Sequence, residues 1–229
     1  MKILFACDLD NTLIHSYKKR RADDICVEIY DGHEQSFISP RALELVKKIA
    51  AQILFVPVTT RSIAQYRRIF WTEDFRPRQA VVTNGAFLLD GDNQENFLKK
   101  VVAPYEAELK LQHENFSDNP AFDICRIVDE SFLYLRCRDD IDADKISFDT
   151  SLTVQGANKK FYLFPPELNK GAALERLIEK FSPDKTFAAG DSVIDTPMLE
   201  VADISFGKGF IEFSAAENFL EKILRALNV

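Results

Sequence analysis

The stretch that decides the fold is the first one, Met1-Lys2-Ile3-Leu4-Phe5-Ala6-Cys7-Asp8-Leu9-Asp10-Asn11-Thr12-Leu13. Residues 2–7 form a short apolar run that stops at Asp8, and a run without polar alternation is typical of a parallel strand buried on both faces. Asp8 and Asp10 then follow with one residue between them. The stretch predicts a buried strand that presents two carboxylates at its carboxyl end.

The same pattern, an apolar run that ends in a polar residue, occurs twice more. Residues 53–58 end at Thr59, and residues 186–189 end in Gly190-Asp191. Pro57 must lie at the end of its strand, because a central strand needs the backbone N–H that proline lacks. A further short strand, residues 80–83, is followed by Asn84-Gly85.

Helix-start signals fall between these strands. Ser39-Pro40 supplies an N-cap and a first-turn proline for a helix over residues 40–51. Ser62 predicts a helix that runs to about residue 70, and helical spacing continues over residues 170–181. The capping-box pattern Ser214-Ala215-Ala216-Glu217 predicts the start of a C-terminal helix.

The middle of the chain has a different texture. Residues 123–128 and 132–137 flank a tight turn at Asp129-Glu130, and helical stretches are expected near residues 103–115 and 139–148. An earlier hairpin, residues 25–29 and 35–38, flanks Asp31-Gly32. We therefore predict an α/β protein with a Rossmann-like parallel sheet core, residues 1–85 and 167–229. An α+β cap, residues 86–166, is inserted into it.

The polar residues at the strand ends should meet, because open α/β sheets bind ligands outside the carboxyl ends of their strands. Asp8 and Asp10 would repel each other without a cation, and Asp191 can add a third carboxylate. Oxygen ligands of this kind suit Mg²⁺ and phosphoryl transfer. Taken alone, the Asp8–Asp10 pair is also what a solvated acidic turn would contain.

Two further segments carry chemistry. Lys170 stands at the start of a helix, where the dipole favours anions, and a bound phosphate would be attracted by both the lysine and the helix terminus. Gly190-Asp191-Ser192-Val193-Ile194-Asp195 places two carboxylates four residues apart. One can hold the metal, and the other can orient the lysine or a metal-bound water. Each segment in isolation is also compatible with a surface lysine or an ordinary N-capping loop.

Four segments of the sequence, taken in chain order, resemble the motifs of the haloacid dehalogenase-like phosphatases, and the resemblance extends over the whole chain. Motif four often has an asparagine where Ile194 stands, and motif two often has glycine or serine at Thr60. The position of the insert resembles that of the type-two cap. This cap is found in the branch with sucrose-phosphate and mannosyl-phosphoglycerate phosphatases and Cof-like proteins. The matching segments are Asp8-Leu9-Asp10-Asn11-Thr12-Leu13, Val58-Thr59-Thr60-Arg61, Asn169-Lys170-Gly171 and Gly190-Asp191-Ser192-Val193-Ile194-Asp195.

The resemblance implies a role for each residue. Asp8 would be the nucleophile that forms an aspartyl-phosphate, and Asp10 the acid and base. Thr59 and Lys170 would hold the phosphoryl oxygens. Mg²⁺ would be bound by Asp8, the backbone carbonyl of Asp10, and Asp191. Asp195 would orient Lys170 or a metal-bound water without binding the metal itself.

Substrate choice should lie with residues near the entrance. Arg61 and Asn84 are expected there as substrate-binding residues on core loops. Charged side chains on the cap strands alternate in direction, so about half of them should face the site. The sequence does not say which; the candidates are Arg126, Arg136, Lys159 and Lys160.

Composition limits the partners. A formal net charge of −7 disfavours nucleic acid or an anionic membrane, and no apolar run approaches the length of a membrane span. The four cysteines show no CxxC pair, which favours reduced thiols and the cytoplasm. We expect a magnesium-dependent phosphatase that acts on a small phosphorylated metabolite, and we expect that metabolite to be a sugar phosphate. The alternatives are a phosphomutase and a non-catalytic protein that senses a phosphorylated ligand.

Overall fold

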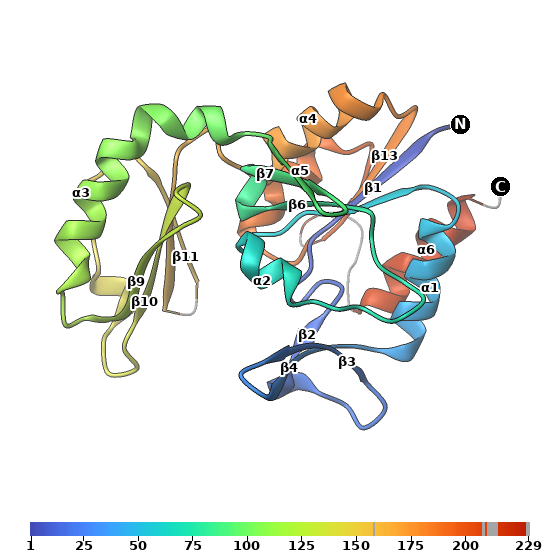
Figure 1. Cartoon of the computed structure of the whole chain (residues 1–229), viewed down its shortest axis with the longest axis horizontal. Coiled ribbons are helices and arrows are strands. Elements are labelled where there is room, and N and C mark those ends of the chain that lie inside the picture. The colour runs from blue at the N-terminus through green and yellow to red at the C-terminus, as the bar shows by residue number, and fades with distance from the viewer. Residues whose placement is uncertain (158, 208, 210–214, 228–229) are drawn as a thin grey trace.

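The computed structural model describes residues 1–157, 159–207, 209 and 215–227, which form two lobes (Figure 1). The larger lobe contains a parallel sheet with the strand order β14-β13-β1-β5. Strand β1 lies between β13 and β5 and is parallel to both. The predicted α/β class and parallel core are confirmed. The strands are β1 (Ile3–Cys7), β5 (Leu54–Pro57), β13 (Lys185–Ala189) and β14 (Ile204–Phe206).

Helices cover both faces of this sheet because alternate residues of β1 pack in opposite directions. Phe5 belongs to the hydrophobic cluster that includes α1 (Pro40–Ala50) and α6 (Ala216–Leu227), and its ring centroid is 6.2 Å from that of Phe219. Leu4 packs on the opposite side, in the cluster of α4 (Lys170–Phe181) and α5 (Thr196–Val201). The strand that carries Asp8 is therefore buried on both faces.

The predicted helix starts are found where the structure describes them. Ser39 Oγ accepts a hydrogen bond from the Ala42 N–H at 3.1 Å, and Ser62 forms a capping box with Gln65. The helix after Ser62, α2 (Ile63–Arg67), ends earlier than predicted, because the chain leaves the helix and buries Ile69 in the core. Pro57 is the last residue of β5. Ser214 lies outside the described residues.

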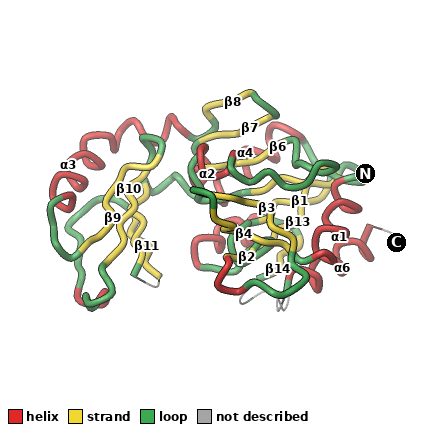
Figure 2. The backbone as a smooth tube through the Cα atoms, turned by 60° about the horizontal axis from the view of Figure 1, so that its bottom comes forward, coloured by secondary structure: helices red, strands yellow, loops and turns green. Residues whose placement is uncertain are grey.

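Two small antiparallel sheets flank the parallel one. The first, ordered β2-β4-β3, contains the predicted hairpin and is called the flap here: β2 (His15–Ser16), β3 (Ile25–Tyr30) and β4 (His33–Ile38). A 3-10 helix, Tyr17–Lys19, directly follows β2. The second sheet, ordered β6-β7-β8, lies beside the parallel sheet in the larger lobe (Figure 2). Its strands are β6 (Gln79–Val82), β7 (Phe87–Asp90) and β8 (Asn93–Asn96).

The smaller lobe is the cap, an antiparallel sheet ordered β11-β12-β10-β9 with α3 (Glu106–Ser117) packed against it. A 3-10 helix, Lys99–Tyr105, leads into it. The tight turn predicted at Asp129-Glu130 is present, with positive φ angles of 42° and 53°. The strands are β9 (Phe122–Val128), β10 (Phe132–Cys137), β11 (Thr153–Ala157) and β12 (Lys160–Phe164).

The prediction of a helix near residues 139–148 is wrong. Only a short 3-10 helix, Ala143–Lys145, forms there. The Asp142 side chain accepts a hydrogen bond from the Asp144 N–H at 3.2 Å. Such a local side-chain bond gives the backbone an alternative to helix.

Candidate active site

The residues at the ends of β1 and β13 meet at one edge of the parallel sheet. Asp8 follows β1, and its N–H donates to the Ala189 carbonyl at the end of β13 at 2.9 Å. The Thr12 hydroxyl lies between the two acidic groups, 3.0 Å from Asp8 Oδ2 and 3.2 Å from Asp191 Oδ1. The sequence analysis gave Thr12 no role. Its place in the loop after β1 is the signal that could have suggested one.

Lys170 enters the same site from α4. Asn169 caps this helix, its side chain accepting from the Ala172 N–H at 2.9 Å. The lysine is almost fully buried, and Nζ lies 2.5 Å from both Asp8 Oδ1 and Asp195 Oδ1. Burial alone would lower the pKa of Lys170, but the charges of Asp195 and Asp8 outweigh it, and the pKa is raised. Lys170 is therefore held as a cation between two carboxylates.

Asp195 uses both of its oxygens to fix this lysine. Oδ1 accepts from Lys170, and Oδ2 accepts from the backbone N–H and the hydroxyl of Ser192 at 2.9 and 2.7 Å. Gly190 makes room for it, because a Cβ at Gly190 would lie 2.6 Å from Asp195 Cγ. Ile194 packs against the hydrophobic core. The arrangement fits the expected place of Asp195 behind the reacting groups.

The acidic cluster carries more negative charge than the lysine can balance. One carboxylate oxygen from each of Asp8, Asp191 and Asp195 lies within 4.8 Å of the others. Burial raises the pKa of Asp8 to about 7, with Lys170 opposing the shift, and burial followed by Asp195 raises the pKa of Asp191. Three carboxylates against one ammonium leave two negative charges, which a divalent cation would neutralise. Hard carboxylate oxygens of this kind fit Mg²⁺.

Asp10 points away from this cluster. Arg61 Nε donates to Asp10 Oδ2 and Arg61 Nη2 to Asp10 Oδ1, both at 2.7 Å. The side chain of Asp10 is about half exposed, at 48%. Because Arg61 holds both oxygens of the Asp10 carboxylate, the main-chain carbonyl of Asp10 is left as the candidate metal ligand.

Arg61 is itself fixed by the flap. Its Nη1 donates to Glu28 Oε2 at 2.8 Å and its Nη2 to Ser36 Oγ at 3.1 Å. Glu28 is only 2% exposed, and its other oxygen accepts from Arg68 Nε at 3.1 Å. Sequence reasoning missed Glu28 and Ser36, since no motif links the flap to Arg61. Arg61 was expected to bind substrate, but much of its donor capacity is used within the protein.

Thr59 and Asn84 are both buried. Thr59 Oγ1 accepts from the Arg61 N–H at 3.1 Å, which shapes the loop after β5. Asn84 was expected to face the entrance. Instead it is 1% exposed, and its Nδ2 donates to the Leu168 carbonyl at 2.9 Å. This bond ties the loop after β6 to the segment that precedes Lys170, so we place Asn84 in the packing beneath the site.

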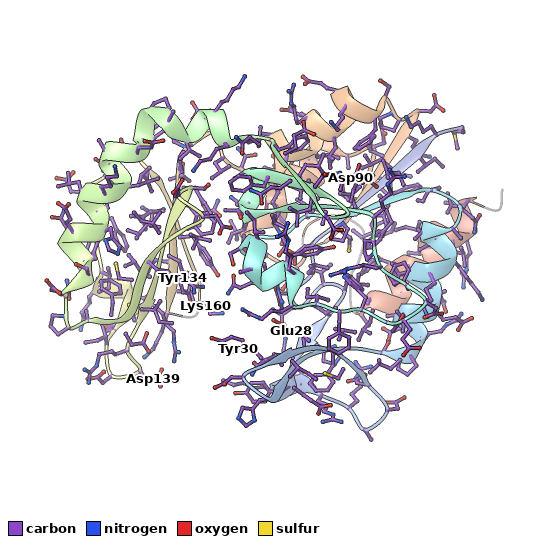
Figure 3. All side chains as sticks on the ribbon, viewed as in Figure 1. Glu28, Tyr30, Asp90, Tyr134, Asp139 and Lys160 are labelled. Atoms are coloured by element: carbon purple, nitrogen blue, oxygen red, sulfur yellow. The ribbon has the colours of Figure 1, made fainter. Side chains whose placement is uncertain are left out.

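A cleft of about 390 Å³ separates the core from the cap. On the core side it is lined by Asp10, Arg61 and the flap, and on the cap side by β9, β10 and β12. Figure 3 shows Tyr134 and Lys160 on the part of the cap that faces Glu28 and Tyr30 of the flap. The Asp10–Arg61 pair thus forms part of the cleft wall.

The structure shows which cap residues face this cleft. Arg126 and Lys160 line it, whereas Arg136 pairs with Asp123 at 3.6 Å. Lys159 donates to the main-chain carbonyl of Asp139 at the far turn. Tyr162 of β12 also lines the cleft.

The comparisons with known proteins support the fold described above. A family model described as haloacid dehalogenase-like hydrolase matches residues 105–208. The sucrose-phosphatase of Synechocystis sp. is 17% identical, with a TM-score of 0.67 and 98% of each chain covered. A phosphatase of the haloalkanoate superfamily from Bacteroides thetaiotaomicron is 14% identical, with a TM-score of 0.63, covering 100% of this chain and 95% of that one.

A third similar structure is the trehalose-6-phosphate phosphatase of Aspergillus fumigatus. It is 15% identical, with a TM-score of 0.54, covering 99% of this chain and 92% of that one. At such identities these likenesses concern the fold. A comparison with curated proteins gives no match. Among the described residues, no helix combines the length and the apolar character that crossing a membrane requires.

Proposed function

We propose that this chain is a haloacid dehalogenase-like hydrolase and, more specifically, a magnesium-dependent phosphatase that removes a phosphoryl group from a small metabolite. The observation that carries the proposal is Lys170, buried and 2.5 Å from both Asp8 and Asp195. A buried carboxylate beside a fixed cation is a nucleophile placed where the charge of a phosphoryl group can be balanced.

In the proposed reaction, the Asp8 carboxylate attacks phosphorus and the bond to the leaving oxygen breaks. Asp10 gives that oxygen a proton. Asp10 then takes a proton from water, which attacks the aspartyl-phosphate and releases inorganic phosphate. Lys170 balances the charge on the phosphoryl oxygens throughout. Thr59, at the end of β5, is proposed to bind one of these oxygens through its N–H or hydroxyl.

The donor set for Mg²⁺ in this proposal is Asp8, the backbone carbonyl of Asp10, and Asp191. Asp195 is left out, since both its oxygens are already hydrogen-bonded to Lys170 and Ser192. When bound, Mg²⁺ would supply charge compensation for the two carboxylates and the phosphate. Thr12 would keep Asp8 and Asp191 in register by its contacts to both.

The cap is proposed to choose the substrate. Strands β7 and β8 pair onto β6 of the larger lobe, so we place the cap at residues 99–164 rather than 86–166. Similar folds belong to proteins named for sucrose and trehalose phosphates, and these names support a sugar phosphate as substrate.

The free cysteines Cys7, Cys26, Cys125 and Cys137 support a reducing compartment, and we propose the cytoplasm.

The test is release of inorganic phosphate from p-nitrophenyl phosphate and from a panel of sugar phosphates, with and without Mg²⁺. Wild-type protein should release phosphate only with the metal present. Asp8→Asn, which keeps the size of the side chain but removes the nucleophile, should retain less than about a tenth of the activity. Asp23→Asn, an exposed aspartate outside the site, is the control. Conversion of one sugar phosphate into an isomer without phosphate release would indicate a mutase instead.

A further inference from the structure

The cap wall of the cleft carries an unbalanced positive charge. Four cations line the cleft, against the two carboxylates of Asp10 and Glu28; the cations are Arg61, Arg68, Arg126 and Lys160. Arg61 pairs with both carboxylates, and Arg68 pairs with Glu28. Two positive charges, those of Arg126 and Lys160, are therefore left over on a chain whose formal net charge is −7.

The two remaining cations lie on the same face of the cap sheet. Arg126 on β9 is the register partner of Tyr134 on β10, and its Cζ lies 5.4 Å from the centre of the Tyr134 ring. Lys160 is at the start of β12. Within the described part of the chain, neither side chain forms an ion pair with a carboxylate. A ring face on one side of Arg126 leaves its N–H groups free to point into the cleft.

Tyr162 belongs to the same cap wall, and Asp10 lies on the core side of the cleft. The ring centroid of Tyr162 is 5.3 Å from that of Tyr134. Burial raises the pKa of the Tyr162 hydroxyl, and the charges of Tyr134, Asp10, Lys170 and Asp8 also act on it. A substrate whose phosphate lies next to Asp8 and Lys170 would place its remaining part between Asp10 and Tyr162 and extend toward Arg126 and Lys160.

We propose that this wall binds a second anionic group of the substrate, a carboxylate or a phosphate other than the one that is removed. The inference rests on the proposed phosphatase function and narrows its substrate class. A neutral sugar would leave Arg126 and Lys160 without a counter-charge when it displaces water from the cleft, and desolvating an unpaired charge is costly. An acidic group at the far end of the sugar would pair with them.

Three substrates that differ at one carbon test this. Glucose 1-phosphate has a hydroxymethyl group there, glucuronic acid 1-phosphate a carboxylate, and glucose 1,6-bisphosphate a phosphate. Phosphate release should give a kcat/KM that is about tenfold higher for at least one acidic compound than for glucose 1-phosphate. The advantage should shrink as salt rises. The arm that wins distinguishes a carboxylate site from a phosphate site.

Matched variants locate the effect. Replacing Arg126 and Lys160 together by alanine should bring the acidic-to-neutral ratio to about one. Lys159→Ala removes a cation of the same sheet whose Nζ donates to the Asp139 carbonyl, so the ratio should be kept. A wild-type enzyme that hydrolyses p-nitrophenyl phosphate but treats the three sugars alike, or a ratio that survives the double change, would overturn the proposal.

A binding measurement distinguishes failure of the proposed anion site from failure of the proposed phosphatase function. If no substrate is hydrolysed, calorimetry with the same three compounds and wild-type protein still decides. Tighter binding of an acidic compound that is lost in the Arg126→Ala, Lys160→Ala variant supports the anion site. Equal binding of all three, or no binding, overturns it.

Discussion

Asp10 and Arg61 face each other through two parallel hydrogen bonds of 2.7 Å, with both carboxylate oxygens acting as acceptors. Through this contact Arg61 fixes the orientation of the Asp10 carboxylate. Glu28 and Ser36 hold the guanidinium from behind. The orientation of Asp10 therefore depends on the flap, which is remote from the four motifs.

The first prediction concerns this pair. Arg61→Lys keeps the charge but loses the planar fork, and we expect the steady-state rate on p-nitrophenyl phosphate to fall by about tenfold. Nitrophenolate leaves without a proton, so formation of the aspartyl-phosphate should continue. A burst of nitrophenolate equal to the enzyme concentration should then appear in stopped-flow records. Arg67→Lys on the exposed side of α2 is the control. Slowing without a burst would assign the fork to the first step.

A second prediction separates Asp10 from Lys170. Asp10→Asn should harm a sugar phosphate more than p-nitrophenyl phosphate, because only the alkoxide leaving group needs a proton. Lys170→Ala should lower both rates alike, since the charge on the transferred oxygens is the same. Single-turnover assays with both substrates measure this. An equal loss on the two substrates for Asp10→Asn would remove its role as acid.

The third prediction concerns the metal. Asp191→Ala should raise the Mg²⁺ concentration that gives half-maximal activity by at least about tenfold, because it removes one proposed ligand. Removing the Asp191 side chain need not unfold the protein. This side chain is only part-buried, and the hydrogen bond that it accepts from the Thr12 hydroxyl is 3.2 Å long. Activity against Mg²⁺ concentration, with circular dichroism as a fold control, gives the answer. An unchanged half-saturation point would exclude Asp191 as a ligand.

The fourth prediction uses the space beside Asp195. Gly190→Ala would force a methyl group into contact with the Asp195 side chain, which is fixed by Lys170 and Ser192. Overpacking of this kind costs about 1–3 kcal/mol, measurable by urea denaturation, and activity should fall with it. Gly32→Ala, in the flap turn, meets nothing within 4 Å of the added Cβ; its φ of 74° strains an alanine there, so it should lower stability and leave activity intact. Wild-type activity in Gly190→Ala would show that Asp195 can shift freely.

Local signals allowed the main parts of the core to be predicted. Apolar runs that end in polar residues identified β1, β5 and β13, and the caps at Ser39 and Ser62 marked helix starts. These features depend on neighbours within a few residues. The meeting of Asp8 with Asp191 followed from one general rule about parallel sheets.

Features set by distant contacts could not be predicted. The pairing of Glu28 with Arg61 depends on how the flap folds over the sheet edge, and nothing in either segment encodes the partner. Strand β7 was assigned to the cap because the chain alone does not show that it turns back onto β6. Asn84 was expected at the entrance because it lies on a core loop, yet its side-chain amide donates to the Leu168 carbonyl.

The central position of β1 bears on the order in which the protein is made. Ile3 pairs with Lys185, so the strand before Asp8 gains one of its two neighbours only after the whole cap has been synthesised. The cap sheet, by contrast, joins strands that follow one another closely. Contacts between segments far apart in sequence form slowly, and domains tend to fold as they emerge from the ribosome. We expect the cap to fold first on the growing chain, with the edge of the sheet around Asp8 completed last.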